Sequence, residues 1–324
     1  MKQFEITKEN EGQRFDKFLG RILSNGGMSF IYKMLRKKNF TLNDKKATGK
    51  EILKEFDVVK LYISDETYDK FKTDINNVPK SLEKNKGKVK SNDFHLDIVY
   101  EDENIILVNK PEGILSQKAT KDDISINEYI LDYLFKSDKL SADKLTNYKP
   151  SVINRLDRNT TGIIIGAKTL KAARVLSDAL KNRTIHKFYK CIVHGKFEGD
   201  GTYKAYLQKN VDINKVLISE EKKSTQDELI ETEYKLIEYD ESRDTSLLEV
   251  NLITGKSHQI RAHLAYLGFP IVGDRKYGAS ELNKRFSARN QLLHAYKIVF
   301  PKFSDDTGFE FSDKTIICEP RFKL

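Results

Sequence analysis

The segment from Asn154 to Gly162 constrains this chain most, because it places charged residues directly before an apolar run. A single carboxylate, Asp157, lies between Arg155 and Arg158, and Ile163–Ile165 follow. The apolar run predicts a buried strand, so we expect the charged segment at the mouth of that strand, where side chains can face a cleft. An opposite charge within about 4–6 Å lowers the pKa of a carboxyl group. Asp157 is therefore expected to be ionised near neutrality, as a nucleophile or electrostatic stabiliser requires.

A surface salt bridge at a strand entry would also explain one Asp flanked by arginines, so the decision depends on other motifs. Residues 154–162, Asn-Arg-Leu-Asp-Arg-Asn-Thr-Thr-Gly, resemble the His-Arg-Leu-Asp-x-x-Thr-Ser-Gly signature of the RluA-type pseudouridine synthases. Further motifs of that family resemble other segments of the chain, in the same order. They lie at 108–113, 187–195 and 252–264, with a continuation at 270–274, 277–278 and 293–295. Five elements in the right order favour the resemblance over a chance match.

Two positions depart from the family pattern. Asn154 replaces the more common His, and Lys256 replaces the more common Arg. Neither position matches the nucleophile, so the departures bear on substrate preference more than on chemistry.

The resemblance implies an isomerase that converts uridine in RNA to pseudouridine and needs no cofactor and no metal. It assigns the catalytic carboxylate to Asp157, which either attacks C1′ or acts through a glycal-forming path. Arg155 matches the residue that fills the space vacated by a flipped base, and Tyr189 matches the ring that packs on that base. Arg261 matches the arginine that pairs with the carboxylate, and Leu293 matches a residue lining the pocket.

Three other kinds of site are not supported by the spacing of their residues. Gly255-Lys256-Ser257 lacks the glycine of a P-loop, because Val250 stands at that position. His258 and His263 are five residues apart without the Glu of a zinc helix, so His258 is expected to order its motif and His263 to lie in the core. A two-carboxylate glycosidase would need a second acid partnered with Asp157, and Asp274 is the only nearby candidate for it.

The positive charge of the chain is concentrated in its first quarter. Residues 1–92 contain 21 Lys and Arg and 13 Asp and Glu, an excess of 8, and the remainder contains 36 and 35, an excess of 1. This asymmetry indicates a polyanion-binding module attached to a nearly neutral body, although a solvated lysine-rich surface would give the same counts.

The sequence between residues 1 and 66 predicts a small module with two helices, at 14–23 and 29–36, and strands at 40–43 and 57–63. It resembles an S4 RNA-binding domain. Residues 67–92 are too polar to form a core and are predicted to be a flexible basic linker. The candidate phosphate contacts of the module are Arg14, Lys33, Arg36, Lys37, Lys38, Lys45 and Lys46.

Residues 93–324 predict an α+β catalytic domain, with strands at 105–108, 163–165, 188–193 and 247–253 and helices at 170–182 and 257–267. Residues 201–246 are expected to form strands joined by a charged insertion around 220–223. The family resemblance implies a mixed, mostly antiparallel sheet with an RNA cleft across it.

No apolar run suggests a signal peptide or a membrane span, and Cys191 and Cys318 form no Cys-x-x-Cys pair. We therefore expect a cytoplasmic monomer that binds RNA, but not DNA or a membrane. Large-subunit ribosomal RNA is the favoured substrate. Transfer RNA, or a non-catalytic role in RNA binding or ribosome assembly, remains an alternative.

Overall fold

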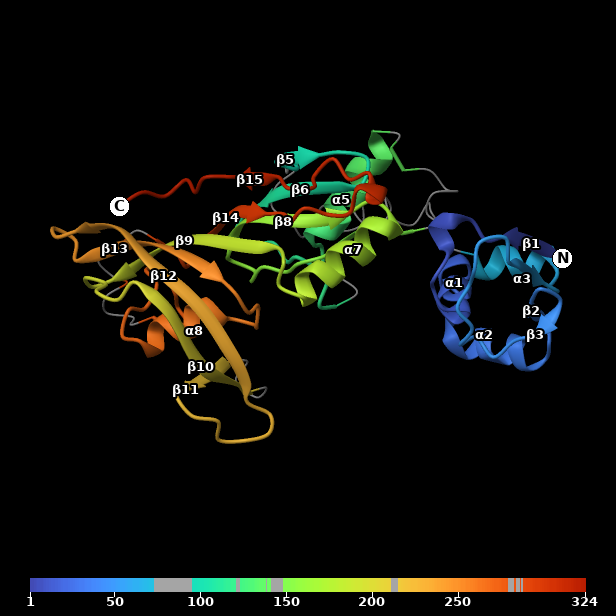
Figure 1. Cartoon of the computed structure of the whole chain (residues 1–324), viewed down its shortest axis with the longest axis horizontal. Coiled ribbons are helices and arrows are strands. Elements are labelled where there is room, and N and C mark those ends of the chain that lie inside the picture. The colour runs from blue at the N-terminus through green and yellow to red at the C-terminus, as the bar shows by residue number, and fades with distance from the viewer. Residues whose placement is uncertain are drawn as a thin grey trace. The chain divides into compact units, whose positions relative to one another are not determined.

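The computed structural model describes residues 1–72, 95–120, 123–137, 139–140, 148–210, 215–278, 283, 286 and 288–324. The chain divides into two compact units (Figure 1). One unit contains residues 1–94, 128–151 and 167–174, and the other contains residues 95–127, 152–166 and 175–324. This division differs from the predicted domain boundaries, because two short segments assigned to the catalytic domain group with the N-terminal residues. Helices α5 (Ile126–Lys136) and α7 (Leu170–Lys181) each contribute residues to both units.

The N-terminal residues form two helices against a four-stranded antiparallel sheet, in the order β1-β4-β2-β3. Both helices expected from the sequence are present, and both expected strands are present in shortened form. The elements are β1 (Lys2–Glu5), the 3-10 turn η1 (Lys8–Asn10), α1 (Phe15–Ile22), α2 (Gly27–Arg36), β2 (Phe40–Leu42), β3 (Lys45–Lys46), β4 (Val58–Leu61) and α3 (Asp65–Phe71).

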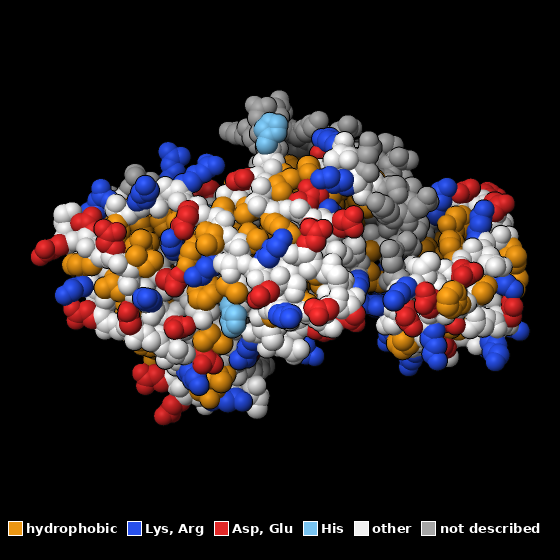
Figure 2. Space-filling model, turned by 45° about the horizontal axis from the view of Figure 1, so that its top comes forward, with side chains coloured by type: hydrophobic (Ala, Val, Ile, Leu, Met, Phe, Trp, Pro, Cys, Tyr) orange, Lys and Arg blue, Asp and Glu red, His pale blue; other side chains and the backbone are white. Residues whose placement is uncertain are grey.

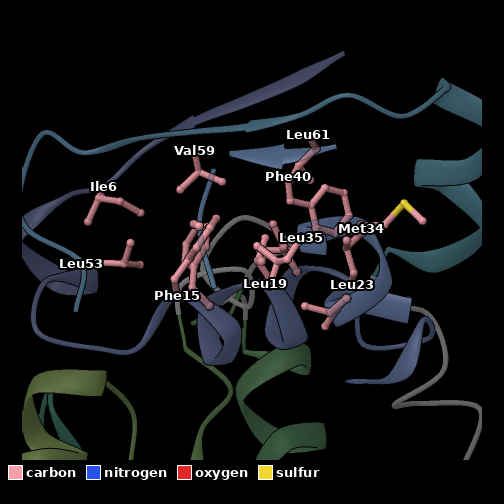
Figure 3. Close-up of a cluster of buried hydrophobic side chains, with 14 residues drawn as sticks. Ile6, Phe15, Leu19, Leu23, Met34, Leu35, Phe40, Leu53, Val59 and Leu61 are labelled. Carbon is pink, nitrogen blue, oxygen red and sulfur yellow. The ribbon is translucent and has the colours of Figure 1, made fainter. Parts of the chain in front are cut away.

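The core of this N-terminal region lies between its helices and its sheet. Phe15, Leu19 and Ile22 recur at the spacing that puts side chains on one face of a helix, and all three are buried. Figure 3 shows Phe15 and Leu19 directed toward Val59 and Phe40 of the sheet. The amphipathic pattern thus explains why α1 packs on the sheet.

Helix α3 extends the ordered N-terminal region beyond the predicted boundary at residue 66. Ser64 caps the helix, because its side chain accepts a hydrogen bond from the backbone N–H of Thr67 at 3.2 Å. Tyr68 and Phe71 pack against the N-terminal core. The first residues of the predicted linker therefore belong to a packed helix, and residues 73–92 lie outside the described residues.

The second unit is built on a mixed sheet of eleven strands (Figure 1). Its main order is β11-β10-β12-β13-β9-β14-β8-β6-β5, with β15 on β14 and β7 on β8. Strands β14 and β8 are parallel, and every other pairing with a defined register among the described strands is antiparallel. The strands are β5 (Ile98–Glu101), β6 (Ile105–Lys110), β7 (Ser151–Val152), β8 (Thr161–Ala167), β9 (His186–His194), β10 (Gly201–Asn210), β11 (Lys215–Ser219), β12 (Glu228–Asp240), β13 (Thr245–Leu252), β14 (Leu293–Val299) and β15 (Thr315–Ile317).

The apolar run Ile163–Ile165 forms the centre of β8 and is fully buried, as the sequence predicts. Gly162 precedes it with φ +106°, a conformation that favours glycine. A Cβ atom at this position would lie 2.2 Å from the carbonyl oxygen of Ala295 in β14. The glycine that ends the charged segment is therefore needed for two strands to approach each other.

Residues 201–246 form strands β10, β11 and β12, and the charged residues 220–223 lie in the connection between β11 and β12. Helix α8 (Gln259–Tyr266) lies within the predicted range 257–267. The other predicted helix is α7, and Thr169 directly before it accepts a hydrogen bond on its side chain from the backbone N–H of Ala172 at 3.2 Å. In the part of the chain that the structure describes, no helix is both long and apolar enough to cross a membrane.

Candidate active site

The loop that carries Asp157 connects β7 to β8, and its backbone is fixed on both sides of this residue. The hydroxyl of Ser116 donates to the carbonyl oxygen of Leu156 at 2.8 Å and accepts from the N–H of the same residue at 2.9 Å. On the other side, Lys110 Nζ donates to the carbonyl oxygen of Arg158 at 2.7 Å. The carboxylate is therefore presented by an immobilised backbone.

Lys110 is completely buried and also donates to the carbonyl oxygens of Pro111 at 2.9 Å and Ile114 at 2.8 Å. Burial lowers the pKa of this lysine to about 7, although the charges of Asp157 and Glu112 oppose the shift. Its motif was recognised in the sequence, but no role was predicted for the lysine itself. The sequence offered one signal for such a role: Lys110 ends an apolar strand and directly precedes Pro111.

Arg261, in α8, connects two carboxylates that lie far apart in the sequence. Its Nη1 donates to Asp157 Oδ2 at 2.7 Å, its Nε to Asp274 Oδ2 at 2.7 Å and its Nη2 to Asp274 Oδ1 at 3.0 Å. Arg261 is 7% exposed and Asp274 is fully buried, whereas the side chain of Asp157 is 26% exposed. The bidentate pair fixes the guanidinium, and the third contact directs the partly exposed carboxylate.

Asp274 therefore serves as a buried partner of Arg261. Backbone N–H groups of Lys276 and Tyr277 donate to its Oδ1 at 2.8 and 3.1 Å. Burial alone would raise the pKa of Asp274, but the hydrogen bonds and charge of Arg261 and the two backbone donors lower it. From the sequence, Asp274 was considered only as a possible second acid of a glycosidase. Its complete burial and its pairing with Arg261 exclude that role.

Tyr189 and Leu293 lie on neighbouring strands, β9 and β14, and both are buried. Cross-strand register pairs Tyr189 with Ala295 and Leu293 with Cys191, so both side chains lie on the same face of the sheet. Burial, and then the charge of Asp157, raises the pKa of Tyr189 well above its ordinary value, so the hydroxyl stays protonated. The structure thus brings Tyr189 into electrostatic range of the carboxylate.

Arg155 is exposed, two residues before Asp157 in the same loop, so it is free to reach a bound molecule. Asn154, which stands where the family more often has His, is used locally. Its side-chain oxygen accepts a hydrogen bond from the backbone N–H of Ile165 at 2.7 Å. This departure from the family pattern therefore helps to hold the loop against β8.

His263 lies in the core, as the sequence predicts. It is buried beside Tyr234, with 3.0 Å between His263 Nδ1 and the tyrosine hydroxyl. Burial lowers the pKa of this histidine to about 4. Among the described residues, no group of three or more His, Cys, Asp and Glu side chains is placed to hold a metal ion.

The seven basic residues predicted to contact phosphate in the N-terminal module are all exposed. Arg14 differs from the others, because its Nε and Nη2 donate to the two carboxylate oxygens of the buried Asp16 at 3.1 and 2.6 Å. The other six have no ion pair with any described residue. They lie on the second half of α2, directly after it, or on β3, and they are Lys33, Arg36, Lys37, Lys38, Lys45 and Lys46.

Residues 93–324 are more balanced in charge than residues 1–92. Figure 2 shows Lys and Arg side chains interspersed with Asp and Glu over the face that it draws. This agrees with the excess of only 1 positive charge in residues 93–324.

Comparisons with known proteins identify the family of this chain. The RNA pseudouridylate synthase family matches residues 104–266. An uncharacterized RNA pseudouridine synthase of Mycoplasma genitalium is 36% identical over 93% of this chain and 89% of its own length. Ribosomal large subunit pseudouridine synthase C of Rickettsia felis is 30% identical over 94% of this chain and 96% of its own length. The solved structure of human RNA pseudouridylate synthase domain containing 1 covers 71% of this chain and 85% of its own, with a TM-score of 0.56 and 20% identity, and supports the fold.

The fold and the site thus define an isomerase that acts on RNA. The chain belongs to the RluA-type family of RNA pseudouridine synthases.

Proposed function

We propose that this chain isomerises uridine to pseudouridine in large-subunit ribosomal RNA, with Asp157 as the carboxylate at the junction of ribose and base. The observation that carries the proposal is the position of Arg261 between Asp157 and Asp274. In this arrangement Asp157 is partly exposed and held in one orientation, whereas Asp274 is buried and paired with Arg261. A single positioned anion is what cleavage of a glycosidic bond without hydrolysis requires.

The base must leave its stack before it reaches Asp157, at a cost of about a few kcal/mol. Tyr189, on the same sheet face as Leu293, offers a ring for the flipped base, and Leu293 offers an apolar wall. Arg155 is exposed in the loop beside the carboxylate and is suited to occupy the vacated position. These three residues support a base-flipping mechanism.

The reaction breaks the bond between C1′ and N1 and forms a bond between C1′ and C5 of the same uracil. The proton on C5 is lost and N1 gains one, so no atom is added and no net oxidation occurs. Our proposal therefore includes no cofactor and no metal. Asp157, or water near it, is positioned to take the C5 proton.

The N-terminal module supports ribosomal RNA as the substrate. We propose that it is an S4-like RNA-binding domain, because six of its exposed basic side chains lie on α2, directly after it, or on the β2–β3 hairpin. The Rickettsia felis relative, which matches over most of both chains, is named for the large ribosomal subunit. The proposed enzyme acts as a cytoplasmic monomer.

The test is Asp157→Asn, assayed with a transcript of the large-subunit ribosomal RNA that carries tritium at C5 of uridine. We expect tritium release to be lost while RNA affinity and thermal stability stay close to wild type, because the amide has the same shape but no charge. The exposed Asp178 provides the control Asp178→Asn, which should keep full activity. Turnover near wild type in Asp157→Asn would rule out the catalytic assignment.

The substrate is tested separately by mapping pseudouridines in cells that lack the protein. We expect sites in large-subunit ribosomal RNA to revert to uridine. If only sites in transfer RNA revert, the target is wrong, and the role of Asp157 is unaffected.

A further inference from the structure

His258 stands directly before α8 as its N-cap residue, three residues before Arg261 in the sequence. Its backbone adopts φ +56°, ψ +13°, the left-handed region that non-glycine residues occupy uncommonly. Such outliers persist where the surroundings fix them, and they cluster at functional sites. The fold therefore holds this residue in a specific conformation beside the arginine that contacts Asp157.

A short relay of hydrogen bonds favours the tautomer of His258 that carries its proton on Nε2. The backbone N–H of Val216, in β11, donates to the hydroxyl oxygen of Tyr277 at 2.9 Å. The same hydroxyl lies 2.8 Å from His258 Nδ1. The backbone N–H of Val216 can only donate. His258 Nδ1 is therefore the one hydrogen-bond acceptor that the described residues offer to the hydroxyl proton of Tyr277. A neutral His258 that accepts at Nδ1 must carry its hydrogen on Nε2.

The Nε2–H group of His258 has no hydrogen-bond partner among the described residues, and the ring of Tyr277 lies between His258 and Arg261. The ring centroid of Tyr277 lies 5.7 Å from that of His258 and 5.3 Å from the guanidinium carbon of Arg261. The ring of Tyr277 thus contacts both His258 and Arg261, the arginine that pairs with Asp157. The Nε2–H of His258 is a donor without a described partner next to that arginine.

The imidazole also stays neutral. Burial lowers the pKa of His258 below its ordinary value. The charged groups around it oppose one another, because Asp157 and Asp274 raise this pKa and Arg261 and Lys276 lower it. At neutral pH the group is then a donor that carries no charge of its own.

We propose that His258 Nε2–H donates a hydrogen bond to a carbonyl oxygen of the reacting uracil. The inference rests on the proposed function, in which Asp157 acts on the same nucleotide. When the bond between C1′ and N1 breaks, its electron pair stays with the uracil and spreads to O2 and O4. A fixed donor at one of these oxygens stabilises that charge, as a donor does in an oxyanion hole.

The test compares His258→Ala with wild type in single-turnover assays at saturating RNA. Loss of one such donor slows the chemical step by about 100-fold, with little change in RNA affinity. His258→Gln, which can place an amide N–H at a similar reach, should retain more activity than His258→Ala. The exposed His95 gives the control His95→Ala, which should leave the rate unchanged.

A substrate substitution separates a donor from a merely structural ring. RNA with 2-thiouridine or 4-thiouridine at the target replaces one carbonyl oxygen by sulfur, a weak acceptor. We expect one of the two thio substrates to slow the wild-type reaction. The same substrate should not slow His258→Ala any further, because that variant already lacks the hydrogen-bond donor. Tyr277→Phe, which frees Nδ1 but keeps the ring, should produce a smaller loss of rate.

The proposal for His258 is wrong if His258→Ala keeps the wild-type rate, or if both thio substitutions slow wild type and variant equally. Asp157→Asn, run beside these variants, keeps the two proposals distinct. Its inactivity together with a fully active His258→Ala would overturn the donor and retain the catalytic carboxylate. An active Asp157→Asn would overturn the proposed function itself.

Discussion

The cluster of ion pairs formed by Asp157, Arg261 and Asp274 and the N-terminal basic module use charge in opposite ways. In the cluster, Arg261 and Asp274 are buried, and their charged atoms have hydrogen-bond partners at defined distances. In the module, residues such as Lys37 and Lys45 are exposed and have no ion pair with a described residue. Chemistry needs a carboxylate held in one direction, which only buried partners can provide. Attraction of a polyanion needs only accessible charge, since Coulomb forces in water act without fixed geometry.

This difference predicts unequal sensitivity to mutation. Breaking a buried ion pair leaves a desolvated charge without a partner, and the cost is about 3–5 kcal/mol. An exposed pair contributes about 0–1 kcal/mol. Single substitutions should therefore be severe in the cluster and mild in the module.

The largest effect is expected for Arg261→Gln, which leaves Asp274 buried without its counter-charge. We expect the free energy of unfolding of the unit that contains Asp157, Arg261 and Asp274, here called the catalytic unit, to fall by about 3–5 kcal/mol and pseudouridine formation to be lost. Urea denaturation and tritium release measure the two effects. The matched control is Arg243→Gln, which removes a surface ion pair between the exposed Arg243 and the half-buried Asp240 and should change stability by less than about 1 kcal/mol. Equal losses in both variants would remove the distinction between buried and exposed charge.

Acid should act on the catalytic unit first, because all six histidines of the chain lie after residue 94. The pKa of His263 falls from 6.5 to about 4 through burial. Between these values the unfolded chain binds a proton that the folded chain excludes, so stability is lost as pH falls from about 6.5 toward 4 and is unaffected above that window. The loss reaches about 3 kcal/mol at most. Urea midpoints between pH 7 and 4 should drop in wild type and change less in His263→Gln; parallel curves would contradict the assignment.

Tyr189→Ala should weaken the complex with the flipped base by about 1–3 kcal/mol, the usual value for stacking of one base on an aromatic ring. The loss should appear in the single-turnover rate more than in initial RNA binding. Tyr189→Phe keeps the ring and should retain most of the activity, unless the protonated hydroxyl takes part in proton removal. An unchanged rate in Tyr189→Ala would make Tyr189 an ordinary core residue of β9.

The smallest effect per residue is expected for the exposed lysines of the N-terminal module. Replacing Lys37, Lys38, Lys45 and Lys46 by Gln should weaken RNA binding and reduce the log–log salt slope by about 0.7–0.9 for each phosphate group that is no longer neutralised. The control changes four exposed lysines of the catalytic unit, Lys222, Lys223, Lys235 and Lys302, to Gln. If both variants shift the slope equally, the module is not a specific RNA anchor.

The sequence predicted the two partners of the central ion pair but not what supports them. Asp157 and Arg261 are 104 residues apart and were matched through motifs, and their hydrogen bond is present in the structure. The role of Asp274 depends on a turn that directs its carboxylate back toward α8. Lys110 donates to backbone carbonyl oxygens, and the sequence does not show which way those oxygens point. Both were therefore visible only in three dimensions.

Helix α3 was missed for a different reason. It is short, and its two packed residues, Tyr68 and Phe71, are separated by charged residues in a segment whose composition favours a linker. Tertiary packing, rather than a repeated apolar pattern, stabilises this helix. Strands β6 and β8 were predicted because each contains an apolar run that favours burial.

The most direct test of the account measures two quantities on one RNA, the single-turnover rate at saturation and the dissociation constant. Asp157→Asn should lose the rate and keep the dissociation constant, whereas the variant with four N-terminal lysines replaced should keep the rate and bind more weakly. The pattern would show that chemistry resides in the buried cluster and affinity in the basic module. A wild-type rate in Asp157→Asn, or a lost saturated rate in the lysine variant, would contradict it.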